Sequence, residues 1–420
     1  MRIVYLNPCG QMGGAEMSLM DLLASMRAAE PLWQFWLVLG EDGPLVDRAK
    51  SAGVQVIVAP FPPALARLGD SGGGSIGALW SCLTAAAGII RYARHLRRTI
   101  AELEPDIVHT NGFKMHVLGA WCSPGKSHPK NAPLIWHVRD YVSTRPLMKW
   151  LLRLHAKRAT AAIGNSLSVA NDIQKVCGSG LETSCIYNAI DLKRYSPVGE
   201  KADLDSLAGL QSAPQGTVRV GLAATLAHWK GHAVFLKALA RLPQDLPLRA
   251  YVIGGAIYQT EKSQRSLDEL RTLAAKLGIA EKVGFTGYVA DTAGAIRSLD
   301  ILVHASTQPE PFGRVIAEGM ASGRAVICSA SPIIAAATSN DCPGTQWPLR
   351  APARSTICAA CCSMRRRWKA GAAILLPLLC VSPSEVIRPS PSRIFIRFCV
   401  RSFPNEAALS TSTSRMSFGS

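Results

Sequence analysis

Short apolar runs rich in β-branched and aromatic residues alternate with segments of helical periodicity in the first part of the chain. Continuous apolar strands separated by helices are typical of a parallel sheet covered on both faces. Between the first two runs, Leu19, Leu22, Leu23 and Met26 share one helix face. The pattern predicts a doubly wound α/β domain over residues 1–195. The six runs are residues 2–8, 33–40, 53–60, 106–111, 133–140 and 160–166.

The same alternation restarts after a polar stretch, 196–216, which we interpret as an interdomain linker. A chain of 420 residues exceeds the size at which one core stops growing, so two domains are expected. The second domain should span 217–330 and open a cleft toward the first, because such sheets bind ligands at the carboxyl ends of their strands. Its runs are residues 218–224, 248–255, 282–289, 300–306 and 325–330, and one helix between them carries Leu267, Leu270, Ala274 and Leu277 on one face.

No uninterrupted run of 18 apolar residues is present, and the start MRIVYLNPCG lacks the basic and apolar regions of a signal peptide. We therefore expect a cytoplasmic protein. Beyond Cys328 the alternation stops. Residues 328–420 contain eleven Lys and Arg but only three Asp and Glu. The second domain should therefore be incomplete, with an aberrant and disordered tail at 331–420.

Three glycines, Gly10, Gly13 and Gly14, lie between the first strand and its helix. Free backbone N–H groups at a helix start suit a phosphate, although a tight strand-to-helix turn would use the same residues. Lys230, directly before Gly231 at another helix start, similarly suits a diphosphate or a solvated turn.

Two carboxylates, Glu310 and Glu318, lie eight positions apart around the turn Phe312-Gly313. Eight helical residues span about 12 Å, too far for a close acid–base pair. Carboxylates at such a separation suit two hydroxyl-bearing parts of one ligand, such as sugars, because they accept paired hydrogen bonds from diols. Two glutamates on a solvated helix face are the alternative.

Seven segments in order resemble the retaining, nucleotide-sugar-dependent glycosyltransferases of family 4. This resemblance covers about residues 1–330, and the two glutamates are its most specific element. It implies the GT-B fold, two Rossmann-like domains facing a cleft, and a hexosyltransferase of polysaccharide biosynthesis that needs no metal or other cofactor. The segments are GGAE (13–16), DIVHTN (106–111), IWHVRDY (135–141), IYNAIDLKRYSP (186–197), WKG (229–231), GFTGYV (284–289) and EPFGRVIAEGMASG (310–323).

The resemblance also implies residue roles. Glu310 would hold donor-sugar hydroxyls near the reacting carbon, with His137 also at that sugar, and Glu318 would bind the ribose diol. Lys230 would bind the diphosphate. The remaining donor contacts would come from the amides near Phe312 and Gly313, from Tyr288 and Val289 at the nucleobase, and from Gly13 and Gly14 near the phosphates and acceptor. His109 is interpreted as a packed strand-end residue, an alternative that also exists for His137.

One position departs from the family pattern, because Thr225 stands where an arginine usually precedes the Lys-Gly pair. Thr225 offers a hydrogen bond but no charge, so Lys230 should carry more of the diphosphate stabilisation. The implied reaction is a front-face displacement with retention, in which the leaving phosphate takes the acceptor proton. The acceptor would be a glycan or a lipid-linked sugar.

Residues 75–98 combine a weakly polar run with Arg91, Arg94, Arg97 and Arg98. This arrangement suits peripheral contact with an anionic membrane, or a core helix with a solvated basic end. Two other functions stay open: a GT-B sugar-nucleotide epimerase, and a non-enzymatic membrane- or polyanion-binding protein. No nucleic-acid partner is expected, because the tail holds one dense basic cluster and no complete zinc-finger spacing.

The tail composition, rich in Arg, Ser, Pro, Ala and Cys, is what a GC-rich gene gives when it is read out of frame. We therefore predict a frameshift shortly after Ile327, in the gene or in its sequencing. The product would then be an incomplete and weakly active or inactive enzyme.

Overall fold

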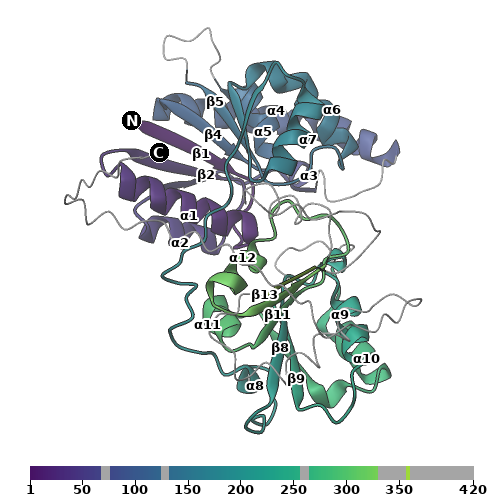
Figure 1. Cartoon of the computed structure of the whole chain (residues 1–420). Helices are drawn as coiled ribbons and strands as arrows, with labels where there is room; N and C mark the ends of the chain where they lie inside the picture. The colour runs from purple at the N-terminus through teal and green to yellow at the C-terminus, as the bar shows by residue number, and fades with distance from the viewer. Residues whose placement is uncertain (68–75, 124–131, 256–263, 330–355, 360–420) are drawn as a thin grey trace, which may run out of the picture. The chain divides into compact units, whose positions relative to one another are not determined.

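The computed structural model describes residues 1–67, 76–123, 132–255, 264–329 and 356–359. All of them belong to one compact unit, Met1–Ser384. They build two separate sheets, each interleaved with helices (Figure 1). The predicted α/β fold with two doubly wound domains is therefore confirmed.

The first sheet has seven parallel strands in the order β3-β2-β1-β4-β5-β6-β7. The order runs outward in both directions from β1 and β4, which is the arrangement of a doubly wound sheet. Six strands match predicted runs, whereas β7 was not predicted because its residues ETSC are mostly polar and lie at the sheet edge. The strands are β1 (Arg2–Asn7), β2 (Gln34–Leu39), β3 (Gln55–Val58), β4 (Ile107–Asn111), β5 (Leu134–Val138), β6 (Ala161–Gly164) and β7 (Glu182–Cys185).

Helices on this sheet bury the faces that the sequence indicates. In α1, Leu19 and Leu23 are fully buried, and Leu22 and Met26 pack against the same cluster. Among the described residues, no helix is long and apolar enough to cross a membrane. The helices are α1 (Gly14–Ala29), α2 (Pro44–Ser51), α3 (Pro63–Arg67), α4 (Ile76–Leu103), α5 (Phe113–Cys122), α6 (Pro146–His155), the 3-10 turn η1 (Ala156–Arg158) and α7 (Leu167–Cys177).

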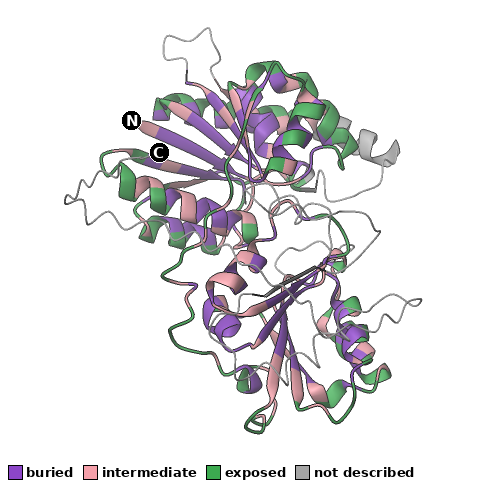
Figure 2. Cartoon of the chain, in the orientation of Figure 1, coloured by how far each residue is buried: buried purple, intermediate pink, exposed green. Residues whose placement is uncertain are grey.

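The second sheet has the order β10-β9-β8-β11-β12-β13. Its first five strands are parallel and match the five predicted runs. Four of them are buried at their centres, whereas β10 is buried only at its first two residues (Figure 2). The strands are β8 (Val218–Ala223), β9 (Leu248–Ile253), β10 (Val283–Gly287), β11 (Ile301–His304), β12 (Ala325–Cys328) and β13 (Thr356–Ala359). The helical segments are η2 (His228–Lys230), α9 (His232–Leu239), α10 (Leu267–Lys276), η3 (Ala280–Lys282), α11 (Thr292–Arg297) and α12 (Arg314–Ala321).

Helix α10 confirms the predicted apolar face, since Leu270 and Ala274 are fully buried and Leu267 and Leu277 pack beside them. Its start is fixed by a capping box, in which the Ser266 hydroxyl accepts from the amide of Glu269 at 3.0 Å. In Figure 1, α9 and α10 lie along one side of the second sheet and α11 and α12 along the other.

Part of the predicted linker 196–216 packs with the second sheet. Its short helix α8 (Leu204–Leu207) buries Leu204 and Asp205. The Asp205 carboxylate accepts from Arg219 at 2.8 Å and from the Tyr251 hydroxyl at 2.7 Å. The segment is thus anchored to β8 and β9 by a buried carboxylate.

Of the tail, only β13 lies within the described residues, where it pairs antiparallel with β12. The rest of the predicted disordered tail, 331–355 and 360–420, lies outside the described residues. The prediction of an altered reading frame stays a prediction.

Candidate active site

Glu310 lies in the loop that joins β11 to α12, and its side chain is buried. Three donors contact the same carboxylate oxygen, Oε1. Lys230 Nζ is 2.6 Å away, His304 Nε2 is 2.9 Å away, and the Ser306 hydroxyl also donates to it. Two of these donors come from the end of β11 and the loop after it, and the third comes from η2, some 80 positions earlier in the chain.

These contacts keep Glu310 ionised. Burial alone would raise the pKa of its carboxyl, but the hydrogen bond from His304 and the charge of Lys230 outweigh burial and hold the pKa well below its usual range. Among the described residues, no hydrogen bond goes to the second oxygen, Oε2. Glu310 is therefore a fixed carboxylate with one oxygen available to accept from a ligand hydroxyl.

Lys230 reaches Glu310 because of the turn that follows it. Gly231 has a φ of 76°, and a Cβ at this position would lie 1.8 Å from the carbonyl oxygen of Ala305. The amide of Thr307 also donates to the Trp229 carbonyl at 2.7 Å. The Trp-Lys-Gly turn is thus pressed against the loop after β11, where only glycine fits.

Glu318 lies in the middle of α12, as predicted, and is buried. Arg314, one turn earlier on the same helix, donates from Nε to its Oε1 at 2.6 Å. Arg314 Nη1 is 2.7 Å from Asp21 Oδ2 and 3.2 Å from the Ser18 hydroxyl, both on α1. Arg314 was not predicted from the sequence, although a basic residue four positions from a glutamate is a recognisable helix pair.

The other residues predicted to contact the donor near α12 and β10 differ in the solvent exposure of their side chains. Gly313 has a φ of 72° and directly precedes α12 as its N-cap, with Phe312 half-buried before it. Tyr288, after β10, is 63% exposed, whereas the side chain of Val289 packs in the core. Of the two residues assigned to a nucleobase, only Tyr288 presents a side chain to solvent.

Thr225 is half-buried in the turn between β8 and η2. Arg265 lies beside this turn, because its backbone amide donates to the Leu226 carbonyl at 2.8 Å. Within the described part of the chain, no ion pair involves the Arg265 guanidinium, and its Nε is buried without a hydrogen bond. Arg265 was not predicted from the sequence, because it lies forty positions from Thr225 and has no motif of its own.

In the first domain, His137 lies within the buried part of β5 and His109 within that of β4. The pKa of His137 lies well below its ordinary value, through burial and then the nearby Arg139. Its Nε2 is buried without a hydrogen-bond partner. His109 packs with its ring 4.7 Å from that of Tyr5, and burial lowers its pKa to about 3. Both rings are therefore neutral at pH 7.

Arg139 follows β5 directly and was not singled out from the sequence. Its Nε donates to Asn111 Oδ1 at 2.7 Å and its Nη1 to Asn188 Oδ1 at 2.6 Å. Burial lowers its pKa to about 10, and no carboxylate in the described ranges lies within ion-pair distance of it. A charged group held by neutral amides at the carboxyl end of a strand is suited to an anion.

In the glycine loop, one backbone amide that the sequence suggests is free for a phosphate is bonded within the protein. The amide of Gly13 donates to Glu16 Oε2 at 3.2 Å, and burial raises the pKa of that buried carboxyl. Gly14 begins α1, and a Cβ there would meet no atom within 4 Å. Packing against the described residues therefore does not require glycine at Gly14.

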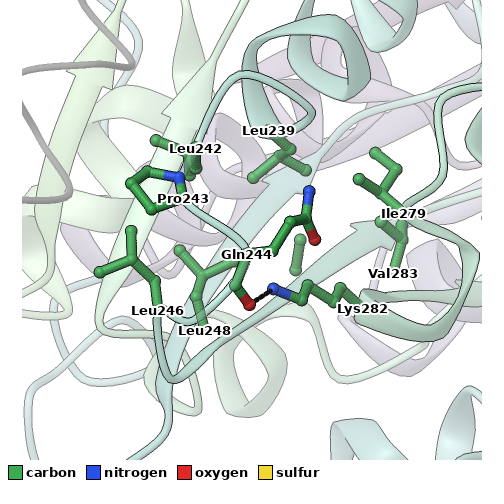
Figure 3. Close-up of a pocket in the computed structure, with 10 residues that line it drawn as sticks. Leu239, Leu242, Pro243, Gln244, Leu246, Leu248, Ile279, Lys282 and Val283 are labelled. Carbon is green, nitrogen blue, oxygen red and sulfur yellow. Dashed lines mark hydrogen bonds between the residues drawn. The ribbon is translucent and has the colours of Figure 1, made fainter.

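The described residues contain a pocket away from this site and no candidate metal centre. An apolar pocket, lined by Leu239, Leu248 and Val283 among others, lies at the amino ends of β9 and β10 (Figure 3), whereas ligands bind doubly wound sheets at the carboxyl ends. Within the described ranges, no group of three or more His, Cys, Asp or Glu residues could hold a metal ion.

Comparison with protein families gives two matches. A model of the glycosyl transferases group 1 matches residues 212–345, and a model of glycosyltransferase family 4 matches residues 12–194. The two matches together cover more than half of the chain and fall on the second and the first sheet.

Comparison with individual proteins also gives a glycosyltransferase and a structure solved with a nucleotide sugar. The lipopolysaccharide core biosynthesis mannosyltransferase LpsB of Rhizobium meliloti (strain 1021) is 26% identical over 218 residues, which are 48% of this chain and 60% of LpsB. The chain thus matches less than two thirds of that relative. The crystal structure of Anabaena Alr3699/HepE in complex with UDP-glucose is 26% identical, with a TM-score of 0.60 over 78% of this chain and 80% of that chain. Its complex with UDP and glucose gives a TM-score of 0.61 with the same coverage.

Proposed function

Because the chain belongs to the group 1 glycosyltransferases of GT-B fold, we propose that it transfers a sugar from a nucleotide-diphosphate sugar to a hydroxyl of a glycan or lipid-linked acceptor. The observation that carries the proposal is the environment of Glu310. A buried carboxylate, kept ionised by Lys230 and His304 on one oxygen, can accept from sugar hydroxyls with the other.

Lys230 has a second role in this proposal. Its ammonium lies directly before Gly231 and α9, where the helix N-terminus adds positive potential. The bond between the anomeric carbon and the phosphate oxygen breaks as the acceptor oxygen bonds to the same face of that carbon. Charge then develops on the leaving diphosphate, and Lys230 stabilises it electrostatically.

The proton of the acceptor hydroxyl passes to the leaving phosphate oxygen, so no protein nucleophile is used and the configuration is retained. Glu318 and its partner Arg314 bind the ribose, Tyr288 stacks on the nucleobase, and His137 contacts the sugar as a neutral hydrogen-bonding group. We propose that Lys230 makes a metal ion unnecessary, so transfer should continue in excess EDTA.

UDP-glucose is the first donor to test, because HepE was solved with it. Isothermal titration of the full chain with UDP-, GDP- and ADP-sugars measures donor binding, and proton NMR of the product reports the anomeric configuration. Binding of none of these nucleotides by a folded chain would overturn the proposal. An inverted product would overturn only the retaining mechanism.

A further inference from the structure

Helix α6, on the first sheet, carries apolar side chains on two opposite sides. Met148 and Leu152 face the core and are buried, as is Ala156 of η1 directly after the helix. On the other side Leu147, Trp150 and Leu154 are 49%, 61% and 59% exposed. Their spacing of three and four places them on one stripe of the helix. Figure 2 colours the outer side of this helix as exposed.

The stripe is surrounded by positive charge. Lys149, Arg153, Lys157 and Arg158 are all exposed, and no Asp or Glu occurs between Tyr141 and Asn171. The carboxylate just outside this range, Asp140, is paired with Arg145 at 2.9 Å. Exposed apolar residues framed only by cations are the composition of a helix that lies in a membrane interface.

The surface continues onto the neighbouring helices. Trp121 of α5 is 38% exposed and donates from its indole nitrogen to His155 Nε2 at 2.9 Å, which joins α5 to α6. Trp121 also lines a shallow groove with Ile90, Arg94 and Arg97 of α4, and Ile90 is half exposed. The apolar and basic pattern thus spans three helices.

We infer that this surface, α6 together with Trp121 and the described end of α4, docks the protein on an anionic lipid bilayer. Leu147, Trp150 and Leu154 enter the interfacial layer while the lysines and arginines contact lipid phosphates. A second copy of the chain fits less well, because a two-fold interface would place this cationic patch against itself. The inference needs no sugar transfer, so it stands or fails separately from the proposed function.

The test is flotation of the full chain with vesicles, since aggregated protein does not float. Vesicles of phosphatidylcholine with about 30% phosphatidylglycerol are compared with vesicles of phosphatidylcholine alone. We expect floated protein only with the anionic vesicles, and less of it as salt is raised.

Two variants separate the apolar and the charge contributions. Leu147→Asn, Trp150→Asn and Leu154→Asn together should reduce vesicle affinity at least about tenfold. Lys149→Gln, Arg153→Gln and Lys157→Gln together should reduce it about a hundredfold at low salt. The substituted side chains are exposed, so circular dichroism and thermal melting should stay like those of the unaltered chain.

Matched controls remove the same groups elsewhere. Lys237→Gln, Arg241→Gln and Lys276→Gln remove three exposed charges from the second domain, and Leu192→Asn with Val198→Asn removes exposed apolar side chains. Neither set should alter flotation, whereas Arg91→Gln, Arg94→Gln, Arg97→Gln and Arg98→Gln together should weaken it.

Three results would overturn the inference. One is equal flotation with neutral and anionic vesicles. Another is unchanged flotation of the α6 apolar variant. The third is a dimer in sedimentation velocity that the apolar variant converts to a monomer without changing flotation, which would assign the stripe to a second copy.

Discussion

Lys230 Nζ lies 2.6 Å from Glu310 Oε1, and both side chains are largely buried. The pair joins the turn before α9 to the loop before α12. A buried charge that loses its partner is costly, so each member sets the protonation and placement of the other. The proposed donor site depends on this pair, which makes it the first target for substitution.

We expect Glu310→Gln to reduce sugar transfer by about 10²–10³-fold, because a neutral amide accepts weakly from hydroxyls near the reacting carbon. Binding of free UDP should stay within about threefold or become tighter, since Lys230 then has no carboxylate to compete with the diphosphate. Lys230→Ala should instead weaken UDP binding by about tenfold or more. Titration calorimetry with UDP and a transfer assay measure both, and an equal loss of UDP affinity in the two variants would contradict the assignment.

Gly231→Ala should unfold the chain more easily than the same change at Gly278. Both glycines have positive φ, 76° and 68°, so both variants carry the backbone cost of about 1–3 kcal/mol. Only at Gly231 would the new Cβ meet a carbonyl, that of Ala305, whereas at Gly278 it meets nothing within 4 Å. Urea unfolding gives the two losses, and similar values would show that the turn before α9 is not held against the loop after β11.

Asp205 anchors the segment between the two sheets, and its pKa is lowered because the hydrogen bond from Arg249 and its other donors outweigh burial. Asp205→Asn should cost about 3 kcal/mol of unfolding free energy, because Arg219 and Arg249 lose their buried carboxylate. The control is Asp203→Asn, since asparagine caps α8 as well as aspartate does. An equally small effect of both changes in urea unfolding would show that residues 196–216 act as a free linker.

His232 begins α9 fully buried, and neither ring nitrogen has a hydrogen-bond partner. Burial, with the charges of Lys230 and Arg265, lowers its pKa to about 4. In the unfolded chain the histidine titrates near 6.5, so only the unfolded state gains a proton as the pH falls from about 6.5 to 4. Stability contributed by the neutral ring is therefore lost across this range.

His232→Leu removes that loss. The unfolding free energy of the variant minus that of the unaltered chain should be about 2 kcal/mol larger at pH 5 than at pH 7.5. Between pH 7.5 and 9 the two chains should keep a constant difference. Urea unfolding at these three pH values measures it, and parallel pH profiles of the two chains would contradict the lowered pKa.

The strands were predictable because both faces of each sheet are covered, which leaves continuous apolar runs in the sequence. Strand β7 was not predicted because an edge strand can be polar, as ETSC is. Glu310 and Lys230 were each identified from their local motifs. Their contact was not, because 80 positions separate them and only the packing of Gly231 on Ala305 brings them together.

The residues that the sequence did not indicate are partners rather than motif members. His304 lay inside a predicted strand, and its bond to Glu310 depends on how the next loop folds back. Arg139 and Arg265 gain their positions from Asn111, Asn188 and Leu226, which lie on other elements. Such long-range contacts leave no period or spacing in the chain.

The tail gives the last prediction. The apolar alternation stops at Cys328, the family match ends at residue 345, and β13 joins the second sheet in the opposite direction to its neighbours. We predict that the reading frame changes shortly after Ile327, and that a chain with this tail is poorly soluble and weakly active. The reason is that missing strands and helices leave a sheet edge and apolar helix faces uncovered.

Resequencing the gene around codon 328 tests the frame directly, and limited proteolysis of the expressed chain tests the fold of the tail. We expect an inserted or deleted base and rapid cleavage within residues 330–420, with the preceding residues resistant. The restored frame should continue with further strand–helix units, and its product should be more soluble and more active. An intact frame together with a protease-resistant segment after Cys328 would contradict the prediction and identify that segment as a folded domain.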